Sequence, residues 1–102
     1  MRKITRFPIY PTKDGLMVVM PAGSRIVTAS KNCNQFYLHV SCQHPRPLDA
    51  ESRLIVAYAD EEVTPDDVGT YIASVPDVGR WCHWHFYALE LVQPLPYLGG
   101  EA

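Results

Sequence analysis

Apolar residues recur at every second position along much of this chain, in short runs that end at turn-forming residues. In the stretch QFYLHVSCQ, residues 35–43, the apolar side chains fall on one face of an extended strand. These side chains are Phe36, Leu38, Val40 and Cys42. We find no helical periodicity sustained over ten residues. Alternation with a period of two, broken by turns, predicts an all-β protein.

Turn signals divide the chain into strand-length segments. We expect strands at residues 4–10, 16–20, 25–30, 35–43, 53–60, 71–75 and 81–91. Pro8 confines the first strand to a sheet edge or a bulge, because proline cannot donate to the ladder. Residues 53–60 are apolar on both faces, which favours the middle of a sheet. The prediction is a small single-domain sandwich or partly open barrel of six or seven mostly antiparallel strands with one short helical turn.

The short helical turn is expected at residues 64–68. Thr64 has the position of an N-cap, Pro65 follows at the first helical position, and acidic residues come next. Gly69 ends the turn. The β domain is predicted over residues 1–92, followed by an irregular C-terminal tail at 93–102 that contains two prolines and two glycines.

Size and charge limit the partners that the sequence favours. The 102 residues fit one domain, and 47% hydrophobic with 20% charged residues indicates an ordered globular protein. The formal net charge of -2 and scattered basic residues make nucleic acid an unexpected partner. The sequence lacks the apolar runs of a signal peptide or membrane span, so no membrane contact and a cytoplasmic location are expected. Three cysteines without a CxxC spacing indicate reduced thiols.

Aromatic residues and histidines are concentrated in GRWCHWHFYALE, residues 79–90. On a strand, alternate side chains point to opposite faces. One face has the composition of a core, with Cys82, Trp84, Phe86 and Ala88. The other face carries Trp81, His83, His85 and Tyr87. This second face is the candidate functional surface.

Metal binding is the first chemistry to weigh at this surface. Two histidines at i and i+2 can reach one metal ion, and His39, Cys42 or His44 could supply a third ligand. No carboxylate stands at a supporting spacing. We therefore predict no metal and no cofactor, and expect the histidines to lie at a partly exposed sheet surface.

Catalysis is not expected either. Cys82 and His83 are adjacent but point to opposite faces of a strand, and the chain has no nucleophile elbow and no glycine-rich loop. The sequence therefore predicts a protein that is not an enzyme.

Exposed aromatic and arginine side chains are typical anchors of protein interfaces. The candidate interface residues are Trp81, His83, His85, Tyr87, Tyr37, His39, Arg80, Arg46 and Arg53. The alternative interpretation is that the aromatic residues cover a second core on the other face of the sheet. Arg46 and Arg53 belong to a second hypothesis, in which the segment at 43–53 binds a nucleotide-like ligand.

Three stretches carry a resemblance to a known family. They are VVMPAGSRIVTA, TPDDVGTYIASV and WHFYALE, which occur in the family's order between residues 4 and 90. The chain resembles a family of small, uncharacterised proteins of tailed bacteriophages and prophages. The positions that match the family's pattern are Met20, Pro21, Gly23, Ile26, Pro65, Gly69, Tyr71, Trp84 and His85. Most are turn-forming or core residues, and Trp81, Cys82 and His83 depart from the pattern.

The resemblance implies a phage accessory protein made in the host cytoplasm, with no assigned activity. Together with the aromatic surface, it leads us to expect a non-catalytic protein that binds and blocks or redirects a host component, for host takeover or counter-defence. Two alternatives stay open at this point. One is an oligomer that binds or sequesters a small nucleotide-like ligand, and the other is a minor structural protein of the phage particle. Exposed strand edges are compatible with a homodimer.

Overall fold

The computed structural model describes residues 1–89, and its regular structure consists of strands and one short 3-10 helix. In chain order the elements are β1 (Arg2–Ile9), β2 (Leu16–Pro21), β3 (Arg25–Asn32), β4 (Gln35–Gln43), β5 (Ala50–Ala59), β6 (Thr70–Asp77), η1 (Val78–Arg80) and β7 (Cys82–Leu89). The predicted all-β fold is therefore confirmed. The tail predicted at 93–102 and the last residues of the predicted domain lie outside the described residues.

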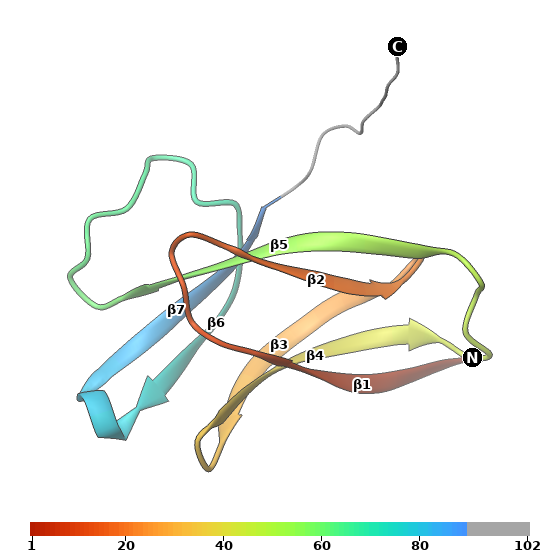
Figure 1. Ribbon diagram of the computed structural model, residues 1–102, viewed down its shortest axis with the longest axis horizontal. Helices are drawn as coiled ribbons and strands as arrows, with labels where there is room; N and C mark the ends of the chain where they lie inside the picture. Colours follow the sequence, from red (N-terminus) through yellow and green to blue (C-terminus); the bar gives the residue numbers. More distant parts are fainter. Residues whose placement is uncertain (90–102) are drawn as a thin grey trace.

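The strands form two antiparallel sheets that pack against each other without closing into a barrel (Figure 1). One sheet has the order β1-β4-β3, and the other has the order β2-β5-β7-β6. Strand β1 is an edge strand and contains Pro8, as expected from the missing donor of proline. Strand β5 lies inside its sheet, which confirms the interpretation of its two apolar faces.

The hydrophobic core lies between the two sheets. Leu38 and Val40 of β4 and Phe86 of β7 are fully buried. The rings of Phe36 and Phe86 approach to 5.9 Å between centroids, so the two sheets meet through an aromatic contact. The core faces predicted for residues 35–43 and for β7 are therefore confirmed, with Cys82 and Trp84 only partly buried.

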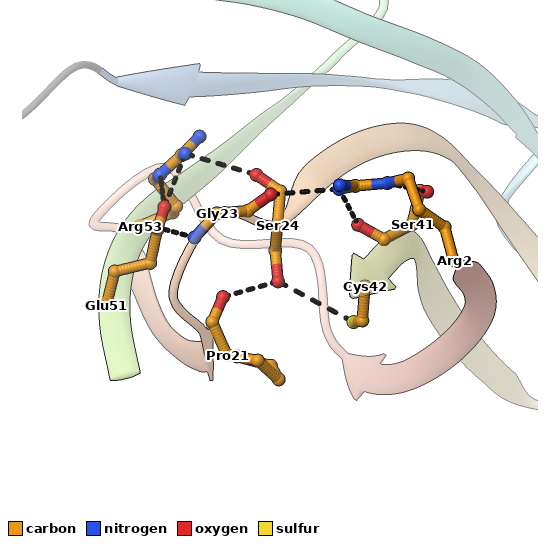
Figure 2. A network of polar contacts seen from close by, with 8 residues as sticks. All are labelled: Arg2, Pro21, Gly23, Ser24, Ser41, Cys42, Glu51 and Arg53. Atoms are coloured by element: carbon orange, nitrogen blue, oxygen red, sulfur yellow. Dashed lines mark hydrogen bonds and ion pairs between the residues drawn. The ribbon is translucent and has the colours of Figure 1, made fainter. Parts of the chain in front are cut away.

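A polar network holds the turn between β2 and β3, where the chain passes from one sheet to the other (Figure 2). Gly23 adopts φ 79°, a conformation that glycine tolerates without strain. Its backbone N–H donates to Glu51 Oε1 at 2.8 Å, and its carbonyl accepts from Arg2 Nη2 at 2.9 Å. Charged side chains from both sheets therefore fix this turn, which the sequence predicted from Pro21 and Gly23.

The helical turn predicted at residues 64–68 is wrong. These residues form an irregular loop, in which Asp67 Oδ1 accepts the backbone N–H of Gly69 at 3.1 Å. An aspartate that binds its own backbone two residues on stabilises a turn instead of a helix. The loop must also run from one end of β7 to the other, because β5 and β6 both pair antiparallel with β7 and are therefore parallel to each other. In the described residues, the one helical turn is η1, between β6 and β7.

Candidate functional site

Trp81 was predicted to lie on a strand face, but the structure places it just before β7. It follows η1 as its C-terminal cap, with φ 55° and ψ 41° in the left-handed region, and β7 begins one residue later. Its backbone N–H donates to the Val78 carbonyl at 3.2 Å, which closes the turn. The residue is 91% exposed. The left-handed conformation therefore turns the indole out of the strand register and into solvent.

Trp81 lies within a small apolar surface at this end of the sandwich. A hollow of about 250 Å³ is lined by Pro76, Asp77, Val78, Trp81, Cys82 and His83. Val78 is 75% exposed. We call Pro76, Val78, Trp81 and His83 the Trp81 surface. Its concave, apolar character is suited to receiving an apolar side chain of another protein.

Asp60 joins the two histidines of β7 in one cluster. His85 Nε2 donates to Asp60 Oδ1 at 2.6 Å, and the backbone N–H of His83 donates to Asp60 Oδ2 at 3.0 Å. The ring Nδ1 of His83 lies 3.4 Å from the same Oδ2. The register that pairs Tyr58 with His85 brings Asp60, two residues further along, opposite His83. Sequence reasoning missed Asp60, since only the pairing of β5 with β7 brings it to the histidines.

These hydrogen bonds stabilise the ionised carboxylate. The bond from His85 lowers the pKa of Asp60 below its ordinary value of 3.8, and the backbone N–H of His83 adds to this effect. A carboxyl group with a depressed pKa in the folded state contributes stability above its unfolded pKa. That contribution is lost as the pH falls through the folded-state pKa.

We expect an acid-dependent difference between wild type and Asp60→Asn. Between about pH 5 and pH 2 the melting temperature of the wild type should fall more steeply, because only the wild type has this carboxylate to protonate. Differential scanning calorimetry across this range measures the effect. The same substitution in the exposed loop, Asp66→Asn, is the control and should follow the wild-type curve. Parallel curves for wild type and Asp60→Asn would contradict the assigned hydrogen bonds.

Tyr87 belongs to an aromatic row on the outer face of the four-stranded sheet. Its ring lies 5.6 Å from that of Tyr71 and 6.3 Å from that of Tyr58, both in edge-to-face geometry. Tyr58 is buried, whereas Tyr71 is 54% exposed. This face therefore combines a packed aromatic cluster with an exposed rim, a mixture of the two interpretations that the sequence left open.

Tyr37 and His39 lie on the other sheet, on the outer face of β4. The guanidinium of Arg6 stands 4.4 Å from the centre of the Tyr37 ring. His39 Nε2 shares a hydrogen bond of 2.6 Å with Ser30 Oγ. The structure therefore does not bring Tyr37 and His39 together with His83 and His85, because the two pairs face solvent on opposite sides of the sandwich.

The three candidate arginines lie apart. Arg80 is exposed in η1, beside Trp81. Arg46 is exposed in the loop between β4 and β5. Arg53 lies on β5, where Nε donates to Glu51 Oε2 at 2.8 Å and Nη2 donates to the Ser24 carbonyl at 3.5 Å (Figure 2). Only Arg80 is adjacent to the Trp81 surface.

Asp77 connects the Trp81 surface to both sheets. It is only 7% exposed and accepts hydrogen bonds from Trp84 Nε1 at 3.0 Å and from Lys31 Nζ at 2.9 Å. The bond from Trp84, followed by that from Lys31, lowers the pKa of Asp77 below its ordinary value. Since Lys31 belongs to β3 and Trp84 to β7, this ion pair fixes the end of β6 from which η1 begins. The base of the Trp81 surface is thereby held in place.

The thiol of Cys82 lies at this same base, on the core side of β7. Burial, followed by the nearby charge of Asp77, raises the pKa of Cys82 above its ordinary value. A raised pKa keeps the thiol protonated, whereas a nucleophilic cysteine needs the thiolate form. Within residues 1–89, no group of three or more His, Cys, Asp or Glu side chains is arranged to hold a metal ion. At Asp60 the histidines hydrogen-bond directly to the carboxylate.

Comparison with known proteins gives one family. The model of a domain of unknown function (DUF7352) matches residues 1–95. No curated protein and no solved structure matches the chain significantly. The described part of the chain contains no helix with the length and hydropathy of a membrane span.

Proposed function

We propose that this chain, which belongs to the DUF7352 family of domains of unknown function, is a non-catalytic accessory factor of a tailed bacteriophage or prophage. Its proposed role is to bind another protein. In this proposal it acts in the host cytoplasm, where it binds a host protein and blocks or redirects it. The phage origin is supported by the sequence resemblance alone. The binding role is supported by the Trp81 surface.

The observation that carries the proposal is the conformation of Trp81. A non-glycine residue in the left-handed region costs about 1 kcal/mol or more, and a β-strand begins directly after it. Glycine would remove this cost. An indole that is 91% exposed contributes little to the core in return. Strain of this kind is concentrated at functional sites, and tryptophan is enriched among the residues that dominate binding energy.

The surroundings of Trp81 fit an interface anchor. The hollow beside it has apolar walls from Pro76 and Val78, and Arg80 and His83 supply polar groups at its border. A central apolar contact with a polar rim is the usual anatomy of a protein interface. The Asp77 ion pair holds the support rigid, so little conformational freedom is lost on binding.

We expect Trp81→Gly to separate binding from folding. The substitution should leave the melting temperature unchanged or raise it, because glycine adopts the left-handed conformation without strain. Binding of the host partner should weaken by roughly 30-fold or more, the loss expected for an anchoring tryptophan. The measurement is affinity capture from a lysate of the host bacterium with quantitative mass spectrometry, followed by calorimetric titration of the enriched partner.

The matched control is Leu48→Ser. Leu48 is a fully exposed apolar residue in the loop between β4 and β5, remote in sequence from the Trp81 surface. This variant should capture the same partner as the wild type. Equal capture of that partner by Trp81→Gly, with its fold intact, would overturn the proposed function.

A second candidate function is favoured by a larger cavity. A space of about 650 Å³ opens between the sheets where β3, β5, β6 and β7 meet, with Arg53 and Tyr71 among its lining residues. This volume lies in the range of small-molecule sites. The guanidinium of Arg53 is suited to the phosphate of a nucleotide-like ligand, which is the ligand class of the second hypothesis from the sequence. The Glu51 carboxylate that pairs with Arg53 reduces the positive charge available to an anion.

Native mass spectrometry of gently purified protein tests this second function. A small adduct on the wild type that absorbs ultraviolet light, and that is lost in Arg53→Gln, would support the cavity as a ligand site. A protein without adduct that also fails to bind added nucleotides in calorimetry would exclude it.

A further inference from the structure

The edges of the two sheets differ in how they are protected against pairing with another strand. Strands β1 and β3 are the edges of one sheet, and β2 and β6 are the edges of the other. An edge strand presents unpaired N–H and C=O groups, and natural proteins protect such edges with charged residues, proline or β-bulges. Each edge can therefore be examined for these features.

Three of the edges carry such features. Strand β1 contains three basic residues, Arg2, Lys3 and Arg6, and the proline Pro8. Strand β3 has an irregular register between Ile26 and Thr28, and β6 has one between Tyr71 and Ala73. In addition, β3 and β6 lie beside each other, so each limits access to the other's edge.

Strand β2 differs from the other edges. Its sequence LMVVMP has no charged residue, and its only proline is the last residue, Pro21. Its pairing with β5 shows no irregularity in register. On its outer face Met17 is 49% exposed and Val19 is 60% exposed. An apolar, regular and uncharged edge of this kind is predicted to pair with another strand.

The directions of the main-chain groups of β2 follow from two hydrogen bonds of β5. The N–H of Asp60, just past β5, donates to the carbonyl of His83 near β7, whereas the N–H of Ala57 donates to Thr12 on the opposite side. Because these directions alternate along a strand, the main-chain N–H and C=O groups of Ile55 and Arg53 also point toward β2. Their partners in β2 are Leu16 and Val18.

The intervening residues of β2, Met17 and Val19, therefore direct their N–H and C=O groups away from β5, toward the free edge. Among the described residues, neither makes a main-chain hydrogen bond outside the pairing with β5. Both residues thus offer a donor and an acceptor for a further strand.

We propose that β2 pairs antiparallel with β2 of a second copy of this chain, about a two-fold axis at Val18. This register sets Met17 opposite Val19 of the other copy, and the same pair recurs across the axis. Each pair uses the outward main-chain groups and exchanges both of its hydrogen bonds. The two four-stranded sheets become one continuous sheet.

A second copy is the occupant that the chemistry of β2 favours. Side chains that face each other in this register are apolar on both faces of the sheet, and no charge meets a like charge. Self-pairing of β1, in contrast, would bring together strands that both carry Arg2, Lys3 and Arg6. A closed two-fold arrangement also uses the exposed edges of both copies, so pairing stops at the dimer.

The test compares Val19→Lys with Val27→Lys. Both valines are exposed on edge strands, Val19 by 60% and Val27 by 52%, but only Val19 lies on β2. Light scattering after size-exclusion chromatography should give twice the 11.5 kDa chain mass for the wild type and for Val27→Lys. In a dimer of Val19→Lys, the introduced lysines of the two copies would lie on the same face of the joined sheet, within a Debye length of each other. Their repulsion should weaken dimerisation by at least about tenfold. Circular dichroism confirms that each variant is folded.

Hydrogen exchange supplies a second, independent measurement. Protection of the Met17 and Val19 amides should rise with protein concentration in the wild type, because only the dimer covers this edge. A wild type that is monomeric at all concentrations would overturn the proposal, as would a dimer that survives Val19→Lys. Protection of these amides that does not depend on concentration would also overturn it, because the edge would then be covered within one chain.

Discussion

Replacement of Phe86 by alanine is expected to lower the free energy of unfolding by about 3–5 kcal/mol, a large part of the roughly 5–15 kcal/mol typical of a domain. Phe86 is fully buried in β7 and contacts Phe36 of the opposite sheet. Its direct neighbours on the two adjacent strands are Ala57 and Ala73. These small side chains cannot fill the space that the ring leaves, so the cavity should persist and the loss should lie toward the upper end of the range.

Urea denaturation followed by far-ultraviolet circular dichroism measures this loss, with Trp81→Ala as the control. Trp81 is also a large aromatic residue, but it is 91% exposed, so its removal should change stability by no more than about 0.5 kcal/mol. A loss below about 1.5 kcal/mol for Phe86→Ala would show that the core is not centred on the contact between the two phenylalanines.

Replacement of Gly69 by alanine is expected to destabilise the protein by about 2–4 kcal/mol. Gly69 adopts φ +91°, a conformation that residues with a side chain rarely adopt. A Cβ atom there would lie 2.5 Å from the Ala88 carbonyl oxygen and 3.0 Å from its carbon. Because these are backbone atoms of β7, no side-chain rotation relieves the clash, and the pairing of β6 with β7 must shift.

The control for this substitution is Gly79→Ala in η1. At Gly79 the φ angle lies outside the strained region, and a Cβ atom would meet Asp77 Oδ1 at 3.7 Å, an ordinary contact. This variant should keep the wild-type stability within about 0.5 kcal/mol in thermal and urea unfolding. Equal stability of the Gly69→Ala and Gly79→Ala variants would contradict the close approach of the loop to β7.

The strands themselves were predictable because their signals are local. Alternating apolar residues are required wherever one face of a strand is buried, so the core positions of β4 and β7 could be predicted from residue types alone. Turn chemistry is equally local, and Gly23 has the positive φ angle expected of it. Pro8 on an edge strand follows from the absence of a single hydrogen-bond donor.

The candidate site was less predictable, because it depends on which strands become neighbours. Asp60 meets His83 and His85 only through the pairing of β5 with β7, and it lies more than twenty positions away along the chain. His39 was grouped with these histidines from the sequence, yet β4 belongs to the other sheet. The alternation of apolar and polar residues along a strand predicts which face each side chain occupies, but it does not predict which sheet the strand joins.

The sequence by itself determined that this protein is a small β domain, where most of its strands run and which faces of β4 and β7 point into its core, because these features follow from periodicity and single-residue backbone preferences. Only the tertiary structure decided the sheet order, the irregular loop in place of a helical turn at 64–68 and the exposure of Trp81. The reason is physical: these features follow from hydrogen bonds between strands that are distant in sequence and from the path that a connection between parallel strands must take. Such interactions leave no periodic signal in a single sequence.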